Sequence, residues 1–243
     1  MIDRLSALLD SGTLAGTDLL VLPELWTSGY FDAAAVTGAS EAADGPGQTR
    51  IADLARSHGL AIALGYPELA GGHRYNTVRL VGADGGDLLS YRKVNLWGDY
   101  ERALFAPGDA PSGIATVRGW RIGFSICYDT EFPETVRDLA LRGADLVLAP
   151  TACGTEFPLV AEAVIRVRAL ENGVWLAFAN RAGREHGYPF DGQSAIVGPD
   201  GMVRARALAD DALICTTLDR TDIATARADT PYLRELRWAP PGL

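Results

Sequence analysis

The chain has 243 residues, 48% of them hydrophobic, so it can bury a sizeable core without disulfides or metal. Its 22 basic and 31 acidic side chains give a net charge of −9, with both signs scattered, which argues against nucleic acid or an anionic membrane as partner. The three cysteines are far apart and form no C-x-x-C pair, which excludes a disulfide framework and a cysteine-based metal site.

The N-terminal stretch MIDRLSALLDSG carries Asp3 and Arg4 and has no apolar run long enough for a signal peptide. No stretch of the sequence reaches the length of a membrane span. We therefore expect a protein of the reducing cytoplasm.

Short apolar runs bounded by Gly, Pro, Asp and Asn predict strands along the whole chain. Helices are predicted at 49–59, 133–143 and 157–173, where glycines stand at the expected C-caps and Pro133 suits a first helical turn. Strands alternating with helices and hairpins predict one α/β domain over residues 1–243, with a mixed sheet or two sheets. The predicted strands are 18–23, 60–66, 75–81, 88–94, 120–126, 145–150, 174–180, 194–198 and 212–218.

Cys127, in FSICYDTEFPE, ends an apolar strand and precedes a helix expected to begin near Pro133. A thiol at such a junction is exposed and feels the positive end of the helix, which favours the thiolate. The alternative is a buried core cysteine, since Cys packs as a small hydrophobe. The polar residues that follow do not continue a core, whereas Cys215 in ALICTTL has the setting of an ordinary strand cysteine. We interpret Cys127 as a nucleophile.

A nucleophilic cysteine needs a base, and His58, His73 and His186 all lie in stretches typical of the surface. A carboxylate with its pKa raised by burial or by a neighbouring charge is therefore the expected base. Glu24 ends the apolar strand in VLPELWTSGY, and Lys93 ends another in YRKVNLWGDYERALFAPG. A carboxylate, an ammonium and a thiol at three strand ends can form an acyl-transfer site, although each charge alone is also typical of a solvated strand end.

In these three blocks, and in RVRALENGVWLAFANRAG and FDGQSAIVGPDG, the chain resembles the nitrilase superfamily of carbon–nitrogen hydrolases. The resemblance runs from about residue 14 to the C-terminus. It implies that Glu24 is the general base, that Lys93 stabilises the oxyanion and that Cys127 attacks the substrate carbonyl. It also implies that Glu101 orients the substrate and assists the lysine, and that the amide of Tyr128 completes the oxyanion hole.

The resemblance also implies a four-layer αββα sandwich that commonly dimerises through helices, so we expect a homodimer or a higher homo-oligomer. Neither a metal nor an organic cofactor is expected. Family members usually begin with a strand before the first helix, whereas this chain begins inside that helix. We therefore expect the sandwich to lack that strand and to expose backbone donors and apolar surface there.

The stretch CYDTEFPE resembles the amidase branches of the family, since true nitrilases usually carry Trp-Glu-Asn after the cysteine. The expected reaction converts a small primary amide and water into a carboxylate and ammonia through a thioester at Cys127. Hydrolysis of an N-carbamoyl amine on the same residues is the alternative within the family. A non-catalytic binding or assembly protein is a second alternative, and a cysteine peptidase using His186 is a third.

Asp99 and Glu131 are candidates for an acidic rim that attracts a cationic amine on the substrate. Trp26, Tyr30 and Trp97 are candidates for apolar walls. The alternative is that Glu131 is held by backbone amides near the helix start and that the aromatic rings pack in the core.

The stretch TAC, residues 151–153, follows the next predicted strand. Thr151 and Cys153 are therefore expected near the substrate. Cys153 is interpreted as a wall residue or a bystander rather than as a second nucleophile.

Overall fold

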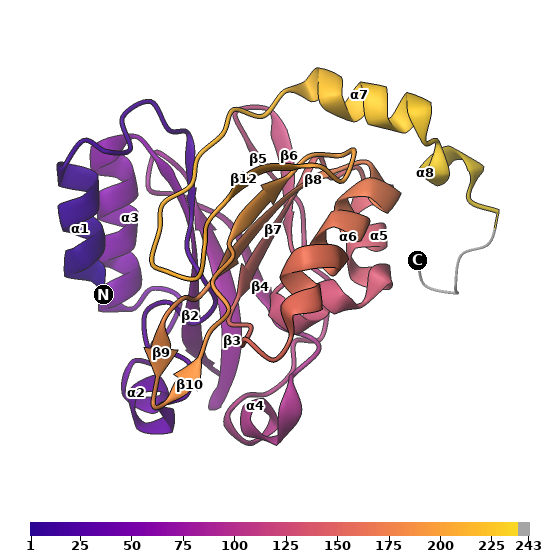
Figure 1. The fold of residues 1–243 in the computed structure, drawn as a ribbon. Coiled ribbons are helices and arrows are strands. Elements are labelled where there is room, and N and C mark those ends of the chain that lie inside the picture. The colour runs from indigo at the N-terminus through magenta and orange to yellow at the C-terminus, as the bar shows by residue number, and fades with distance from the viewer. Residues whose placement is uncertain (238–243) are drawn as a thin grey trace.

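The computed structural model describes residues 1–237, in which two sheets lie face to face between two layers of helices (Figure 1). One sheet has four strands in the order β1-β2-β3-β4, and the other has six in the order β12-β11-β8-β7-β6-β5. Both sheets contain parallel and antiparallel pairs. The strands are β1 (Leu19–Val21), β2 (Ala61–Ala70), β3 (His73–Val81), β4 (Asp87–Arg92), β5 (Ala115–Val117), β6 (Trp120–Phe124), β7 (Leu146–Thr151), β8 (Trp175–Asn180), β9 (Arg184–Glu185), β10 (Tyr188–Pro189), β11 (Ala195–Val197) and β12 (Val203–Arg206).

Helices α1 and α3 cover the outer face of the four-stranded sheet, and α5 and α6 cover that of the six-stranded sheet (Figure 1). The predicted four-layer αββα sandwich is therefore confirmed. Across residues 1–237, no helix is both long and apolar enough to span a membrane. The helices are α1 (Ile2–Asp10), α2 (Ala33–Gly38), α3 (Pro46–His58), α4 (Gly98–Leu104), α5 (Pro133–Leu141), α6 (Ile165–Asn172), α7 (Arg220–Asp229) and α8 (Tyr232–Glu235), with a 3₁₀ turn at Cys127–Glu131 and a π-helical turn at Val160–Val164.

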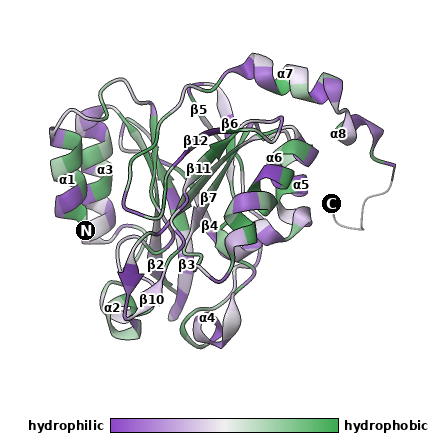
Figure 2. Cartoon of the chain, viewed as in Figure 1, coloured by the Kyte–Doolittle hydropathy of each residue, from purple (hydrophilic) through white to green (hydrophobic). Residues whose placement is uncertain are grey.

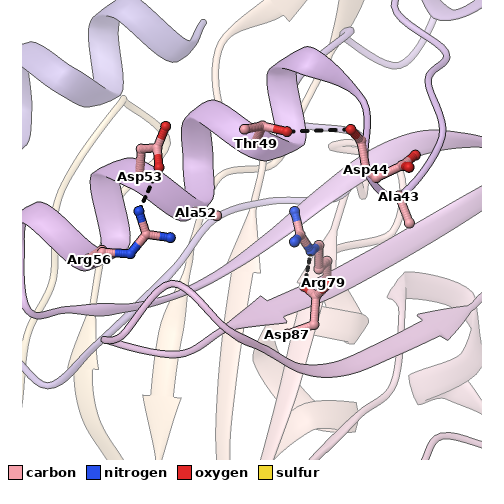
Figure 3. A pocket seen from close by; sticks show the side chains of 8 residues that line it. All are labelled: Ala43, Asp44, Thr49, Ala52, Asp53, Arg56, Arg79 and Asp87. Atoms are coloured by element: carbon pink, nitrogen blue, oxygen red, sulfur yellow. Dashed lines mark hydrogen bonds and ion pairs between the residues drawn. The ribbon is translucent and has the colours of Figure 1, made fainter.

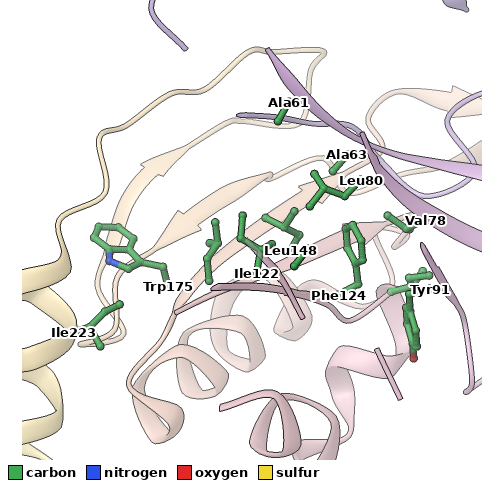
Figure 4. Close-up of a cluster of buried hydrophobic side chains, with 13 residues drawn as sticks. Ala61, Ala63, Val78, Leu80, Tyr91, Ile122, Phe124, Leu148, Trp175 and Ile223 are labelled. Carbon is green, nitrogen blue, oxygen red and sulfur yellow. The ribbon is translucent and has the colours of Figure 1, made fainter. Parts of the chain in front are cut away.

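The main core lies between the two sheets, where Val78 and Leu80 of β3 share one apolar cluster with Phe124 of β6 and Leu148 of β7 (Figure 4). Strand β7 is buried along its whole length because helices cover one of its faces and the other sheet covers the second. The strands between the helical layers are accordingly mostly hydrophobic (Figure 2). Because both sheets contribute to this core, it fixes the position of the strand ends of one sheet relative to those of the other.

The strand directions place the candidate catalytic residues at the ends of the strands. Strands β1 and β2 are parallel, and β2-β3-β4 form an antiparallel run, so β1 and β4 point the same way. Glu24 and Lys93, which follow these two strands, therefore leave the same edge of the four-stranded sheet. Strands β6, β7 and β8 are parallel neighbours, so the residues that follow them also gather at one edge.

The prediction of a strand at 212–218 is wrong. Its burial still alternates, with Ile214, Thr216 and Leu218 half-buried and the residues between them exposed, but it pairs with no strand among residues 1–237. An alternating pattern reports which side chains pack, whereas a strand also needs a neighbour for its backbone bonds. Cys215 is correspondingly exposed in an irregular segment.

Several short elements were not predicted, namely the strands β5, β9, β10 and β12 and the helices α2, α4, α7 and α8. The strands among them have two to four residues and are too short to show a period. The predicted helix 157–173 is a π-helical turn followed by α6, and it ends at Gly173 in the left-handed conformation as expected.

Gly65 of β2 allows the turn after β1 to approach the sheet closely. A Cβ atom at this position would lie 2.4 Å from the backbone nitrogen of Leu25 and 2.8 Å from the Cα of Glu24. The Gly65 carbonyl also accepts a hydrogen bond from the backbone N–H of Thr27, at 3.3 Å. The absence of a side chain at Gly65 thus allows the backbone of Glu24 to lie directly against β2.

Gly65→Ala is expected to lower the free energy of unfolding by about 1–3 kcal/mol, because the added methyl group meets backbone atoms that cannot yield without moving the turn. Urea unfolding followed by circular dichroism measures the change. Gly38→Ala is the matched control, since nothing lies within 4 Å of a Cβ there. Equal stability of the two variants would contradict the interpretation of Gly65 as a point of obligatory contact.

Candidate active site

Three chemically distinct side chains meet at the facing edges of the two sheets. Glu24 lies just after β1 and Lys93 directly after β4, so both come from the four-stranded sheet. Cys127 lies just after β6 of the six-stranded sheet and begins the 3₁₀ turn. Cys127 packs against the same apolar cluster as Val94, the residue after Lys93, and Asp129 of its turn accepts hydrogen bonds from Tyr91 and Asn95 on either side of Lys93. The site is therefore divided between the sheets.

Lys93 is the centre of a fully buried ionic cluster. Its Nζ lies 2.8 Å from Oε1 of Glu24 and 2.7 Å from Oε1 of Glu101, and all three side chains are inaccessible to solvent. The side-chain amide of Asn76 donates to the same oxygen of Glu24 at 2.7 Å. A buried charge requires partners of this kind, because removing it from water is costly.

Glu101, at the start of α4, is held through both of its carboxylate oxygens. The hydroxyl of Tyr30 donates to Oε1 at 2.7 Å, beside the bond from Lys93, and the backbone N–H of Trp97 donates to Oε2 at 2.6 Å. Glu24 differs from Glu101 in this respect. Within residues 1–237, its Oε2 atom is buried and has no hydrogen-bond partner.

Burial and mutual charge set the protonation states of the cluster. Burial raises the pKa of Glu24 above its ordinary value, while the charge of Lys93 acts in the opposite direction. For Lys93, burial alone would lower the pKa, but the charges of Glu24 and Glu101 outweigh it and raise the pKa well above its usual value. Lys93 therefore remains an ammonium ion, and Glu24 is a stronger base than a surface glutamate.

The surroundings of Cys127 act on its pKa in the direction opposite to the one predicted from the following helix. Burial raises its pKa well above the ordinary value, Glu24 raises it further, and Lys93 only partly opposes this. The 3₁₀ turn separates Cys127 from α5, which begins at Pro133, so the end of that helix is not beside the sulfur. A base must therefore remove the thiol proton before or during attack.

The backbone conformation at Cys127 is unusual for a residue with a side chain. Its φ angle is +46°, in the left-handed region that L-residues seldom adopt. The residue as a whole is half-buried, and its side chain packs against the apolar cluster between the two sheets. Such a strained turn turns a side chain out of the strand direction and is characteristic of functional positions.

Asp129 joins the nucleophile's turn to the strand that carries the lysine. Its Oδ2 accepts a hydrogen bond from the Tyr91 hydroxyl at 2.8 Å, and its Oδ1 accepts from the backbone N–H and the side-chain amide of Asn95 at 2.8 and 2.9 Å. The sequence predicts that the acids after Cys127, Asp129 among them, belong to the rim and support of its pocket, whereas it gives no role to Asn76. The available signals were an acid two positions after the cysteine and an asparagine on the apolar face of β3.

The predicted apolar walls are placed differently by the structure. Trp26 packs with α1 and α3 on the far side of the four-stranded sheet, so that prediction is wrong. Tyr30 is only 2% exposed, and its hydroxyl supports Glu101. Trp97 is half-buried with its ring edge-on to Phe157, at 5.9 Å between centroids, next to the amide that binds Glu101.

The predicted acidic rim consists of two unlike residues. Asp99 is fully exposed and pairs with Arg102 at 2.9 Å. The carboxylate of Glu131 is half-buried, and burial raises its pKa. The backbone carbonyl of Glu131, rather than its carboxylate, accepts a hydrogen bond from Arg168 at 2.7 Å. A role of Glu131 in substrate binding stays a prediction.

The remaining predicted substrate contacts, Tyr128, Thr151 and Cys153, differ in burial and in what they pack against. Tyr128 is half-buried with its ring edge-on to Phe132, at 5.0 Å between centroids. Thr151 is fully buried and its hydroxyl donates to the carbonyl of Ala149 at 3.0 Å, whereas Cys153 packs in the cluster under α6. The oxyanion role of the Tyr128 amide and substrate contacts by Thr151 and Cys153 stay predictions.

A cavity of about 300 Å³ lies away from these residues, between α3 and strands β3 and β4 (Figure 3). Four of its charged side chains form two ion pairs, Arg56 with Asp53 and Arg79 with Asp87. In the part of the chain that the structure describes, no group of three or more His, Cys, Asp or Glu side chains is arranged to hold a metal ion.

Comparisons with known proteins agree with this arrangement. The carbon–nitrogen hydrolase family matches residues 2–228. A hydrolase encoded in the pqqF 5′ region of Pseudomonas protegens is 46% identical over 222 residues, which are 90% of this chain and 78% of the relative. An (R)-stereoselective amidase of a Pseudomonas species is 37% identical over 227 residues, covering 93% of this chain and 82% of the relative.

A solved structure extends the agreement to three dimensions. The NitN amidase of Nesterenkonia sp. AN1 superposes with a TM-score of 0.83 at 33% identity, covering 97% of this chain and 89% of that one. A variant of the same amidase carries the acetamide moiety of fluoroacetamide covalently added at its active-site cysteine. From its sequence, its fold and these relatives, the chain belongs to the carbon–nitrogen hydrolases of the nitrilase superfamily and is an amidase-like hydrolase with an active-site cysteine.

Proposed function

We propose that the protein hydrolyses the C–N bond of a small primary amide, giving a carboxylate and ammonia through a thioester at Cys127. Glu24 is the general base, and Lys93 stabilises the negative charge that develops on the substrate oxygen. Glu101 fixes the position of Lys93 through a second buried ion pair. These roles account for every member of the buried cluster.

The observation that carries the proposal is the free oxygen of Glu24. Its Oε1 already accepts bonds from Lys93 and Asn76, whereas its buried Oε2 has no partner among residues 1–237. A buried acceptor without a donor costs free energy, and a thiol or a water that presents a proton would remove that cost. Both oxygens of Glu101 are occupied, so Glu101 is the poorer candidate for the base.

The reaction follows from these positions. Oε2 of Glu24 accepts the Sγ proton as the sulfur attacks the amide carbon, and the carbonyl electron pair moves to oxygen, where Lys93 and backbone N–H groups stabilise it. The C–N bond then breaks and the nitrogen takes the proton back from Glu24, leaving as ammonia. Water gives a proton to Glu24 as its oxygen attacks the thioester carbon. The C–S bond then breaks, the sulfur takes that proton back from Glu24 to re-form the thiol, and the released acid loses a proton to solvent and becomes the carboxylate.

The relatives support this substrate class. One similar protein is named an amidase, and the solved amidase bears an acetamide group on its cysteine. An N-carbamoyl amine presents the same terminal carboxamide group to the same side chains, so it is the second candidate. The two are separated by their products, because an N-carbamoyl amine also releases carbon dioxide and an amine.

The purified chain is expected to release ammonia from at least one member of a panel of short primary amides, and Cys127→Ala is expected to release none. The panel includes amides with and without a terminal amine and one N-carbamoyl amine. Mass spectrometry of the quenched reaction tests for the acyl group on Cys127. Cys215→Ala is the control, because that cysteine is exposed and lies outside the site. A folded wild type that hydrolyses none of these compounds would favour a non-catalytic binding role.

Glu24→Gln is expected to lower kcat by about 10²–10⁴-fold, because the amide cannot accept the thiol proton. Glu101→Gln is expected to lower kcat less, since it weakens the placement of Lys93 but leaves the base intact. Steady-state kinetics on the best amide compares the two isosteric variants. A larger loss in Glu101→Gln than in Glu24→Gln would reverse the assignment of the base.

The acid limb of kcat/KM is expected above pH 4.5, the ordinary value for a glutamate. The sign follows from the role of Glu24: only its ionised form accepts a proton, and burial raises its pKa, so activity is lost on acidification earlier than for an exposed glutamate. Initial rates between about pH 4 and pH 9 measure the limb. A limb at or below pH 4.5 would show that the titrating group is not a buried carboxylate of this kind.

A further inference from the structure

The base and the nucleophile are carried by different sheets, so their separation depends on contacts that cross between the sheets. Glu24 lies in a turn in which Leu25 and Gly29 both have positive φ angles, +46° and +85°. Such a turn lacks the regular backbone hydrogen bonds that fix a helix or a strand, so other contacts must fix its position. Lys93 and Asn76 fix the Glu24 side chain to the four-stranded sheet, but neither reaches the sheet that carries Cys127.

Arg181 adds a direct connection from the cysteine-bearing sheet to the backbone of the Glu24 turn, besides the indirect one through Asp129 and Lys93. It directly follows β8, and its backbone N–H donates to the carbonyl of Thr151 at the end of β7, at 3.1 Å. Its Nη1 atom donates to the carbonyls of Glu24 and Leu25, both at 3.3 Å. The side chain is only 16% exposed, so these bonds are shielded from water. One residue thus ties the base's own backbone to the strand beside the nucleophile's strand.

Glu185, four residues on in the β9–β10 hairpin, completes the connection. Both of its carboxylate oxygens accept the backbone N–H of Tyr30, at 2.9 and 3.0 Å, and its Oε2 lies 3.5 Å from Nη2 of Arg181. A Cβ atom at Gly29 would lie 2.2 Å from this carboxylate, so the glycine is required for the approach. Arg181 thus contacts the Glu24 end of the turn and Glu185 contacts its Tyr30 end. The hydroxyl of Tyr30 in turn donates to Glu101.

We propose that Arg181 and Glu185 form a positioning pair that holds the Glu24 turn at the distance from Cys127 needed for proton transfer. The inference rests on the proposed roles of Glu24 and Cys127. Neither residue of the pair touches the reacting atoms. The planar guanidinium suits this task because one of its nitrogens reaches the two carbonyls while another faces the carboxylate, whereas the donors of a lysine all lie on a single nitrogen.

The test compares Arg181→Lys, Glu185→Ala and Glu185→Gln with the wild type. Arg181→Lys and Glu185→Ala are expected to lower kcat by about 10- to 100-fold with KM little changed, because a shift of about 1 Å between reacting groups has an effect of this size. Glu185→Gln retains an oxygen that accepts the Tyr30 N–H and is expected to recover most of the activity. Rates are expressed per folded molecule, and melting temperatures are recorded in parallel.

The rate at which N-ethylmaleimide, which has no primary carboxamide group, alkylates Cys127 at about pH 7 is the second readout, because it depends on proton removal by Glu24 but not on turnover of an amide. It is expected to fall in Arg181→Lys and Glu185→Ala and to return towards the wild-type rate in Glu185→Gln. Asp200→Ala is the matched control. It also breaks an acid–arginine pair four residues apart, with Arg204 at 2.9 Å, in the turn between β11 and β12.

Lower melting temperatures in Arg181→Lys and Glu185→Ala, with unchanged kcat and alkylation rate per folded molecule, would overturn the positioning role and leave a purely structural pair. A wild type that turns over no amide would overturn the proposed function instead. In that case the alkylation rates alone decide on the positioning pair: a selective loss supports it, and equal rates in all variants overturn it.

Discussion

The placement of one ammonium group between two carboxylates, in full isolation from water, is the constraint on which this structure depends. Lys93 is charged and completely buried, and a charge in such a position is tolerated only when its partners are close and well oriented. Each partner therefore needs support of its own, which Asn76 supplies to Glu24 and Tyr30 to Glu101. The charge of Glu24 adds to the effect of burial in raising the pKa of the Cys127 thiol, and the charge of Lys93 opposes it.

A second constraint arises because the two sheets each carry only part of the site. Asp129 connects the turn of Cys127 to the strand end that bears Lys93. Arg181 connects the cysteine-bearing sheet to the turn of Glu24. Gly65 lets that turn lie directly against β2. The shared apolar core between the sheets then keeps these connections in register, so packing far from the chemistry contributes to the geometry at Cys127.

The residues at strand ends were predictable because an apolar run that stops at a polar side chain marks both the strand and the edge that the side chain leaves. This pattern alone indicates Glu24, Lys93 and Cys127 as candidates. It failed at 212–218, where the alternation is present but no neighbouring strand among residues 1–237 pairs with it. It also misplaced Trp26, because an aromatic residue two positions from a glutamate can face the opposite side of the same sheet. A local sequence pattern predicts that a residue is buried, but it does not predict which residues it packs against.

The amino-acid order alone indicated the alternation of strands and helices, the kinds of functional group available and the family they resemble, because these depend on neighbours along the chain. The tertiary structure determined which groups meet and in which protonation state. Lys93 and Glu24 are 69 positions apart, and Arg181 reaches a carbonyl 157 positions away. The raised pKa values of Glu24 and Cys127 come from burial by residues distant in the sequence. A pKa depends on the surrounding dielectric and on nearby charges, and both exist only once the chain has folded.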